Sequence, residues 1–271
     1  MKILVTGSKG YIGSLLCMAL RSIGVKVVEF DIINGDNICD IDAVNKASKG
    51  VDSIIHLAAI VGYPAVEKDP DLAYRVNVLG TQNIVNTGNR IVFASALSNY
   101  EVSGTVDEDT EINAITNYAK QKLEAEKAVL AGRGNVVTRF GSLYGCSPNM
   151  RWDLLMHTLI KNAVKTGNID VYQPDFIRAF SNIEDVILAL TMFAFKDEQH
   201  GVFNVVSINM SKRELAEIIK AETMCNVNIV DGWDEESRNY TVSSEKIKKL
   251  GFKFNPRLRE SVFEISQFAR R

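Results

Sequence analysis

The sequence predicts an α/β protein, with a doubly wound parallel Rossmann sheet and a smaller C-terminal α/β lobe. Two observations carry this prediction. Short β-type runs alternate with longer helical stretches through the first half of the chain, and a glycine-rich turn follows the first run. Strands that alternate with helices pair in parallel through right-handed crossovers. The 271 residues, of which 46% are hydrophobic and 24% charged, suffice for a full core and a smaller lobe.

The spacing of apolar residues gives the elements of the first half. Residues 2–6 form an apolar run typical of a buried strand, and residues 11–23 place their apolar side chains on one stripe of a helix. Further strands are expected at residues 25–30, 53–57, 90–95 and 136–140, and further helices at residues 43–47, 72–86 and 117–130.

The pattern loosens after Tyr144. A helix is expected over 153–165 with Asp153 as its N-cap, and another begins at Ser211, which forms a capping box with Glu214. The remaining expected elements are helices at 182–193 and 258–268 and a strand at 201–206. We expect a first domain over residues 1–144, with elements from about 182–206 returning to it, and a smaller lobe from 145–181 and 207–271.

The glycine turn, Gly7 to Gly13, follows the first strand and opens the first helix. Gly7 permits a tight turn, Gly10 lets the backbone approach a pyrophosphate, and Gly13 lets the helix pack close to the sheet. The helix N-terminus then offers N–H groups to the anion. Glycines alone also occur in ordinary turns, but the strand–turn–helix context favours a dinucleotide site.

Asp31 stands just past the second strand, near the position of the acid that holds the adenosine ribose. A carboxylate there accepts hydrogen bonds from ribose hydroxyls and repels a 2′-phosphate, so it favours NAD over NADP. Lys9, inside the glycine turn, is a cation that a 2′-phosphate would suit. We give Asp31 more weight because its position is more diagnostic.

Tyr118 and Lys122 are four residues apart in a predicted helix, so their side chains lie on one face. A phenol titrates near pH 10, and a nearby ammonium lowers that pKa. Tyr118 would then act as a base toward a sugar hydroxyl. A Tyr and a Lys at this spacing also occur on solvated helix faces. Here the helix follows the fourth strand of a sheet that carries a glycine turn, and this favours catalysis.

With these motifs the chain resembles the extended short-chain dehydrogenase/reductase family, which includes NAD-dependent nucleotide-sugar epimerases and dehydratases. The resemblance runs nearly from end to end. The other segments that carry it are Asn37–Asp40, His56–Ala59, Asn77–Asn83, Arg139–Gly145, Arg178–Asp185 and Arg238–Tyr240. It implies that NAD is bound by Gly7, Lys9, Gly10, Tyr11, Ile12, Gly13, Asp31, Asn37, Ile38, Leu57, Ala58, Ala59, Asn77, Tyr118 and Lys122. Asn37 and Ser142 replace the family's usual Asp and Asn.

The resemblance also implies substrate contacts from Ser98, Arg151, Arg178 and Arg238. The guanidinium forks of Arg178 and Arg238 match phosphate oxygens. His157 and Cys146 lie in the same part of the chain. For both we favour a structural role over a chemical one.

One departure concerns catalysis. The family usually has Ser or Thr four residues before the tyrosine at position 100, and here Ala96 stands there. Ser95 and Ser98 flank it, and we take Ser95 as the third catalytic residue after Tyr118 and Lys122. The acid pair of the 4,6-dehydratases is absent from residues 96–98, which argues against that reaction.

Charge and cysteine usage exclude other classes. The net charge of −2 gives no general attraction to nucleic acid or anionic membranes. No apolar run reaches the roughly 18 residues of a spanning helix, and no signal-peptide pattern begins the chain. The four cysteines are scattered without metal-ligand spacing, so we expect no metal site and a cytoplasmic location. The resemblance implies a homodimer formed through helices 72–86 and 117–130.

These observations predict an NAD-dependent nucleotide-sugar epimerase that transiently oxidises a sugar carbon. Two alternatives stay open. One is an NAD(P)H-dependent reductase of keto-sugar nucleotides. The other is a catalytically impaired, dinucleotide-binding regulatory protein, which Ala96 favours and the intact pair of Tyr118 and Lys122 disfavours.

Overall fold

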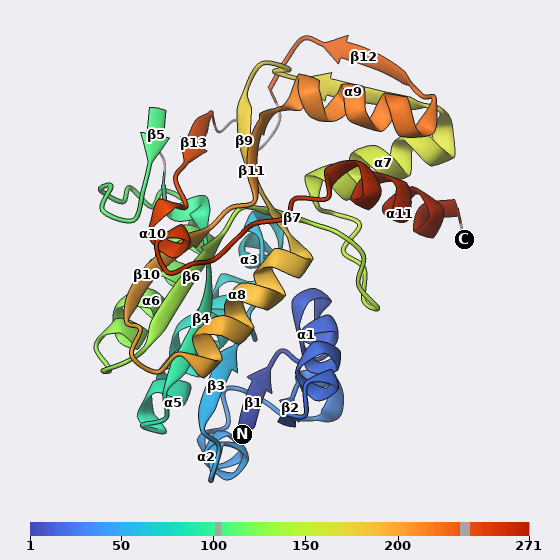
Figure 1. Ribbon diagram of the computed structural model, residues 1–271. Helices are drawn as coiled ribbons and strands as arrows, with labels where there is room; N and C mark the ends of the chain where they lie inside the picture. The colour runs from blue at the N-terminus through green and yellow to red at the C-terminus, as the bar shows by residue number, and fades with distance from the viewer. Residues whose placement is uncertain (101–103, 234–238, 271) are drawn as a thin grey trace. The chain divides into compact units, whose positions relative to one another are not determined.

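A computed structural model describes residues 1–100, 104–233 and 239–270. Its central sheet has the strand order β10-β6-β4-β3-β1-β2 (Figure 1). The strands are β1 (Lys2–Thr6), β2 (Lys26–Phe30), β3 (Ser53–His56), β4 (Ile91–Ala96), β6 (Val136–Phe140) and β10 (Gly201–Val205). β1 pairs in parallel with β2 and with β3, and β3 pairs in parallel with β4. The predicted doubly wound parallel sheet is confirmed.

The strand order reverses at β1, because β2 lies on one side of it and β3 on the other. In open α/β sheets, ligands bind outside the carboxyl ends of the strands at such a switch point. The register pairs Thr6 with His56, so β1 and β3 end side by side. The glycine turn and the loop at residues 57–60 leave the sheet from these two ends.

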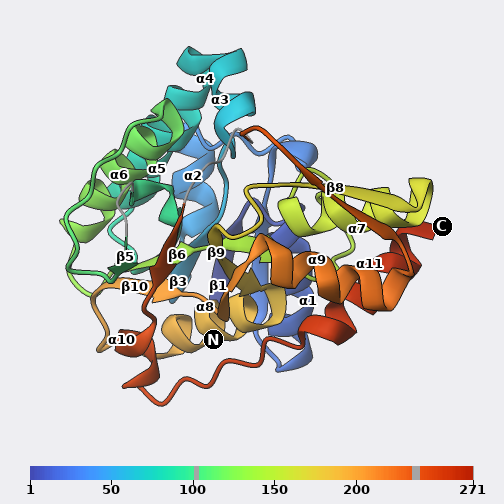
Figure 2. The ribbon, with the colours of Figure 1, turned by 90° about the horizontal axis from the view of Figure 1, so that it is seen from above.

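The chain divides into two compact units, and most of the sheet belongs to unit 1 (Met1–Glu101, Thr110–Arg139 and Ile187–Phe203). The helices of this unit include α1 (Tyr11–Ser22), α2 (Ile41–Ser48), α5 (Gly80–Asn86), α6 (Asn117–Leu130) and the later part of α8 (Ile183–Phe195). Figure 2 shows α2, α5 and α6 on one side of the sheet and α1 on the other. Core residues on the first side include Val44, Ile84, Phe93, Val129 and Val137.

The helix expected over residues 72–86 is present, but it contains a π-helical turn that the prediction lacked. The chain there forms α4 (Pro70–Tyr74), the π-helical turn η2 (Arg75–Leu79) and then α5, after a short α3 (Tyr63–Lys68). In the π-helical turn, the N–H of Gly80 bonds to the carbonyl of Arg75, five residues earlier. A π-helical turn holds one more residue than an α-helical turn, and the helical spacing of apolar residues does not mark where that residue is inserted. Such turns are frequent at functional sites.

Unit 2 comprises Val102–Asp109, Phe140–Val186 and Asn204–Arg271. Its helices α7 (Leu155–Thr166), α9 (Lys212–Thr223) and α11 (Leu258–Arg270) share a core that includes Ile160, Leu215 and Ile265. The short strands β8 (Asn168–Tyr172) and β12 (Asn226–Val230) pair in parallel. β9 (Ile177–Asn182) pairs with β7 (Ser142–Tyr144) and β11 (Ile208–Ser211), and β5 (Gly104–Val106) pairs with β13 (Tyr240–Val242). The short helices elsewhere are η1 (Ile32–Asn34), η3 (Leu97–Asn99) and α10 (Glu245–Lys248).

Two local features of unit 2 test the predicted helix starts. The capping box at Ser211 is confirmed, because its Oγ accepts from Glu214 N–H at 3.1 Å while Glu214 Oε2 accepts from Ser211 N–H at 2.7 Å. The N-cap at Asp153 is wrong. α7 begins two residues later with Leu154 as its N-cap, and the Asp153 carboxylate is held by Arg151.

None of the helices in the described ranges is both long enough and apolar enough to cross a bilayer.

Candidate active site

The glycine turn of unit 1 is shaped for a phosphate group. Gly7 has a φ of +68°, and a Cβ on it would lie 2.8 Å from the backbone nitrogen of Ala58. A Cβ on Gly13 would lie 2.1 Å from the Gly7 carbonyl oxygen, so only glycine lets the helix start pack on the turn. Gly10 is the N-cap of α1 and has no side chain to accept from the first N–H groups of the helix. This helix start therefore suits an anion.

Asp31 follows β2 directly and is buried. Its Oδ2 accepts from the backbone N–H of Lys9 at 2.8 Å, and its Oδ1 accepts from Ile33 N–H at 3.0 Å. The carboxylate thus ties the glycine turn to the end of β2. Each carboxylate oxygen accepts more than one hydrogen bond, so both can still accept from a hydroxyl.

The Lys9 ammonium forms an ion pair with Glu29 of β2, which also pairs with Arg21. The hydrogen bond from Lys9 is the main reason that the pKa of Glu29 lies below its usual value. Because Glu29 already balances the Lys9 charge, Lys9 argues less for a 2′-phosphate than its place in the turn suggests.

The loop after β3 contains the predicted cofactor residues Leu57, Ala58 and Ala59, and side chains from two other elements hold it. Thr6 Oγ1 accepts from the N–H groups of Leu57 and Ala58, each at 3.2 Å. Asn77 Oδ1 accepts from Ile60 N–H at 2.8 Å, and its Nδ2 donates to the Ile60 carbonyl at 3.0 Å. Asn77, also predicted to bind the cofactor, is 1% exposed and uses its amide to hold this loop.

The segment Asn77–Asn83 also seats the predicted adenine-side pair, Asn37 and Ile38. A Cβ on Gly80 would lie 2.7 Å from Ile38 Cγ2, and Asn83 Nδ2 donates to the Ile38 carbonyl at 3.1 Å. Ile38 is consequently part of the core. Asn37 is exposed, and its Oδ1 accepts from Cys39 N–H at 2.9 Å.

Helix α6 carries the Tyr–Lys pair. Thr116 caps it by accepting from Ala119 N–H at 3.1 Å, which places Tyr118 in the first turn. Lys122 follows one turn later, 4% exposed, with its Nζ 4.3 Å from the centroid of the Phe93 ring. Burial lowers the pKa of Lys122 to about 8, although the nearby Glu126 carboxylate raises it. At pH 7 the ammonium therefore persists, and Lys122 is one helical turn after Tyr118 on α6.

Strand β4 ends at Ser95 and Ala96. Ser95 lies two residues after Phe93 and so on the same face of the strand, the face on which Lys122 covers the Phe93 ring. The hydroxyls of Ser95 and Ser98 are buried and make no hydrogen bond to any described residue. Buried hydroxyls are rarely left unpaired, so either can serve a substrate or cofactor.

A buried ion pair that the sequence analysis missed anchors α6. Arg139 of β6 donates to Glu126 through Nε at 3.0 Å and Nη2 at 2.7 Å, and its Nη1 donates to the Tyr100 hydroxyl at 2.6 Å. The two charged side chains are 3% and 2% exposed. No local spacing in the sequence marks this pair, because Glu126 and Arg139 are 13 residues apart and lie on different elements.

The predicted substrate residues of unit 2 differ in their burial and in their partners. Arg178 is buried on β9, with Nη2 3.5 Å from Ser142 Oγ. Arg151 is half-buried and pairs with Asp153. Arg238 lies outside the described residues.

His157 and Cys146 have the structural surroundings that we favoured. His157 is fully buried, with Nδ1 2.7 Å from the Arg151 carbonyl and Nε2 accepting from Gly145 N–H at 3.2 Å. Nε2 accepts an N–H and so carries no proton itself, and burial is the main reason that the pKa of His157 is lowered. The ring thus orders the loop before α7. Cys146 packs, half-buried, against the core of unit 2.

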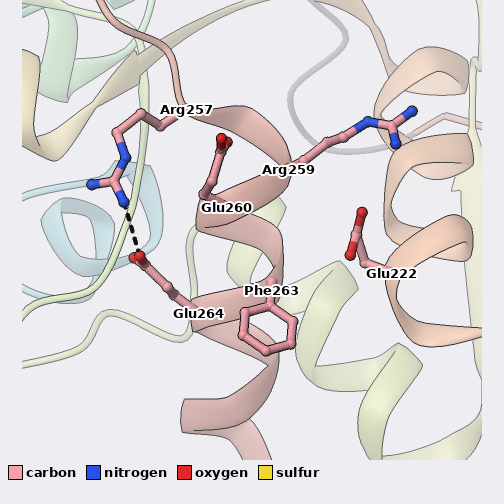
Figure 3. Close-up of a pocket in the computed structure, with 6 residues that line it drawn as sticks. All are labelled: Glu222, Arg257, Arg259, Glu260, Phe263 and Glu264. Atoms are coloured by element: carbon pink, nitrogen blue, oxygen red, sulfur yellow. Dashed lines mark hydrogen bonds and ion pairs between the residues drawn. The ribbon is translucent and has the colours of Figure 1, made fainter.

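Figure 3 shows a surface hollow of about 400 Å³ in unit 2. It is lined by Glu222, Arg257, Arg259, Glu260, Phe263 and Glu264. Arg257 pairs there with Glu264 at 3.1 Å, and none of the predicted site residues contributes to the lining. We do not include this hollow in the candidate active site.

The sheet with its switch point, the uncapped glycine turn, the acid after β2 and the Tyr–Lys helix together define a dinucleotide-dependent enzyme of the short-chain dehydrogenase/reductase type. The model of the NAD dependent epimerase/dehydratase family matches residues 3–206. The chain belongs to this family, and the resemblance stated from the sequence is confirmed.

Individual relatives cover most of the chain. The uncharacterized UDP-glucose epimerase YtcB of Bacillus subtilis is 28% identical over 261 residues, which are 83% of this chain and 81% of that protein. The dTDP-4-dehydrorhamnose reductase of Mycolicibacterium smegmatis is 26% identical over 78% of this chain and 66% of its own length. The solved structure of MoeE5 in complex with UDP-glucose and NAD is 26% identical, with a TM-score of 0.88 and full coverage of both chains.

Proposed function

We propose that this protein is an NAD-dependent nucleotide-sugar epimerase. The observation that carries the proposal is the buried Lys122 ammonium, one helical turn from Tyr118 on α6. Such a pair suits reversible removal of a proton from a sugar hydroxyl, which epimerisation through a ketone requires. The likeness to a structure that holds both UDP-glucose and NAD supports the nucleotide-sugar part of the proposal.

The residues of unit 1 fit NAD. The uncapped start of α1 suits its pyrophosphate, and a Cβ on Gly10 would lie 3.2 Å from the Gly7 carbonyl in the same turn. The buried hydroxyl of Ser8 makes no hydrogen bond to any described residue, so the turn also has a donor to offer. Asp31 would accept from the ribose hydroxyls, which favours NAD over NADP.

Each chain residue then has a role in the proposed reaction. When bound, NAD supplies reversible hydride acceptance. Tyr118 takes the hydroxyl proton as the base and returns it at the end of the cycle. Lys122 stabilises the Tyr118 phenolate through its positive charge. The hydroxyl of Ser95 or Ser98 orients the reacting oxygen, in place of the side chain that Ala96 lacks. Arg178 and Arg151 hold the anionic part of the substrate.

A reductase of keto-sugar nucleotides is the second candidate. The reductase from Mycolicibacterium smegmatis supports it, and the same Tyr–Lys pair would protonate the ketone oxygen as hydride arrives. The two candidates differ in cofactor balance, because an epimerase regenerates NAD within one turnover and a reductase consumes one NAD(P)H per product.

The first experiment uses this balance. Purified protein is incubated with UDP-glucose and a trace of NAD, and separately with a 4-keto sugar nucleotide and excess NADH or NADPH. Chromatography follows the sugars, and absorbance follows the nicotinamide. Epimer formation without net NADH supports the proposal. Stoichiometric NAD(P)H loss on the keto sugar overturns it in favour of the reductase.

Tyr118→Phe is the matched control for both reactions. It removes one hydroxyl and leaves the cofactor turn intact, so turnover should fall at least a hundredfold while NAD binding persists. The regulatory alternative gives a different result. The protein would then bind NAD but turn over no sugar nucleotide, and Tyr118→Phe would change no measured activity.

We also infer a homodimer that uses the α4–α5 region and α6. Leu72 and Leu79 are 38% and 48% exposed there, and apolar side chains at such exposure suit a helical interface. Light scattering should give twice the chain mass, and Leu79→Glu should lower it. A monomer at micromolar concentration refutes this inference.

A further inference from the structure

A line of buried hydrogen bonds crosses unit 1 between the two predicted cofactor loops. It begins at Thr6, the last residue of β1, whose Oγ1 is 2.7 Å from Nδ1 of His56, the last residue of β3. His56 Nε2 is 3.0 Å from Thr81 Oγ1, which donates to the Asn77 carbonyl at 2.7 Å. All four residues are at most 1% exposed, so water does not compete for these bonds.

The direction of each bond follows from its neighbours. Thr81 gives its single hydroxyl proton to the Asn77 carbonyl, so toward His56 it can only accept. Thr6 Oγ1 already accepts from two N–H groups of the loop after β3, so its own proton goes to His56 Nδ1. His56 therefore carries one proton, on Nε2, and is neutral. Burial, and secondarily the charge of Lys122, lowers its pKa to about 3, in agreement with this assignment.

The line continues to the catalytic helix. Asn77 Nδ2 donates to Gln121 Oε1 at 2.9 Å, and Gln121 lies on α6 between Tyr118 and Lys122. The His56 ring also lies 5.4 Å from the Phe93 ring, over which Lys122 places its ammonium. A protonated His56 would set a second positive charge near Lys122 and leave the Thr6 hydroxyl without its acceptor, which is unfavourable on both counts.

We propose that His56 is a positioning residue that holds the glycine turn, the loop after β3 and α6 in one arrangement, so that Tyr118 and Lys122 meet a cofactor bound by the two loops. The inference rests on the proposed function. It assigns a role to Thr6, Thr81 and Gln121, for which the sequence motifs gave none.

Thr81→Val tests the proposal because it removes the hydroxyl that both accepts from His56 and donates to Asn77. The matched control is Thr138→Val. Thr138 is equally buried in unit 1, and its hydroxyl donates to the Phe93 carbonyl at 3.0 Å, outside the line. Thr81→Val should weaken NAD binding by about threefold to tenfold, the scale of one net hydrogen bond, while Thr138→Val should leave it within about twofold. Thr81→Ser, which keeps the hydroxyl, should restore binding.

Nitrogen-15 NMR of the wild-type protein provides a readout that needs no variant. It should show His56 neutral at pH 7 with its proton on Nε2, and still neutral at pH 5. A proton on Nδ1, or a charged ring, overturns the proposal whatever NAD does. Equal effects of Thr81→Val and Thr138→Val on NAD affinity also overturn it.

Failure of the proposed function has a different signature, because the wild-type protein would then form no epimer, or bind no dinucleotide, while the His56 spectrum stayed as expected. If Thr81→Val does not fold, Gln121→Met tests the other end of the line. It removes the acceptor of Asn77 Nδ2, and unchanged NAD affinity and turnover in that folded variant would overturn the link to α6.

Discussion

The ion pair between Glu126 and Arg139 gives the sharpest quantitative prediction. Glu126→Gln keeps the shape of the side chain but removes its charge, and it leaves one amide NH₂ group facing the Arg139 donors. Both side chains are at most 3% exposed, so solvent cannot replace the lost carboxylate. Removing one partner of a buried pair costs about 3–5 kcal/mol. At about 2–4 °C per kcal/mol for a chain of this size, Tm should fall by roughly 6–20 °C.

The double variant Glu126→Leu, Arg139→Met removes both charges. It therefore separates the effect of losing the ion pair from the cost of leaving the Arg139 charge buried without a partner. Replacing an entire buried pair with apolar side chains is often neutral or stabilising, so the double variant should be more stable than Glu126→Gln. Urea unfolding gives the free energy of unfolding of each variant, and thermal unfolding gives its Tm. A loss below about 1 kcal/mol in Glu126→Gln, or a double variant that is less stable still, refutes this account of how α6 is anchored.

The same substitution should also alter Lys122, for which we propose a catalytic role. The Glu126 carboxylate raises the pKa of Lys122, which burial lowers to about 8. Without that carboxylate, Lys122 should lose its proton at a lower pH. The alkaline limb of the pH–rate profile should therefore move to lower pH in Glu126→Gln, and an unmoved limb would show that Lys122 does not control it.

Three further predictions follow. Gly13→Ala should destabilise unit 1 and abolish NAD binding, because its Cβ would lie 2.1 Å from the Gly7 carbonyl oxygen. In Gly10→Ala the corresponding distance is 3.2 Å, so this variant should fold and lose mainly NAD affinity. Equal losses of stability in urea would contradict this prediction. In wild-type protein kcat/KM should fall as pH rises through about 8, where Lys122 loses its charge, and Lys122→Arg should lack that limb. Finally, the folded-state pKa of His56, about 3, lies below its unfolded value of about 6.5. As pH falls, the unfolded chain therefore takes up a proton at His56 before the folded protein does, and stability should decline from about pH 6.5 toward pH 3. His56→Gln should reduce this dependence of Tm on pH in thermal unfolding. An unchanged dependence would contradict the prediction.

The sequence by itself determined the features that depend on neighbouring residues. Apolar runs marked the strands of the central sheet, and helical spacing placed α6 at the residues where the structure has it. The glycine turn was predictable because its requirements are local, namely a positive φ at Gly7 and room for a helix start at Gly13. The capping box of Ser211 and Glu214 is equally local, since both bonds close within four residues.

Only the tertiary structure decided which polar groups meet across the chain. Glu126 and Arg139 are 13 residues apart, and Thr6 and His56 are 50 apart, so no spacing rule connects them. The π-helical turn at Arg75 and the short strands of unit 2 also escaped prediction. A three-residue strand such as β7 carries too few alternations to be distinguished from a loop until its partner pairs with it. The physical reason is common to all of these: a buried charge, a histidine tautomer or a short strand is fixed by partners that folding brings together, and the local sequence does not specify them.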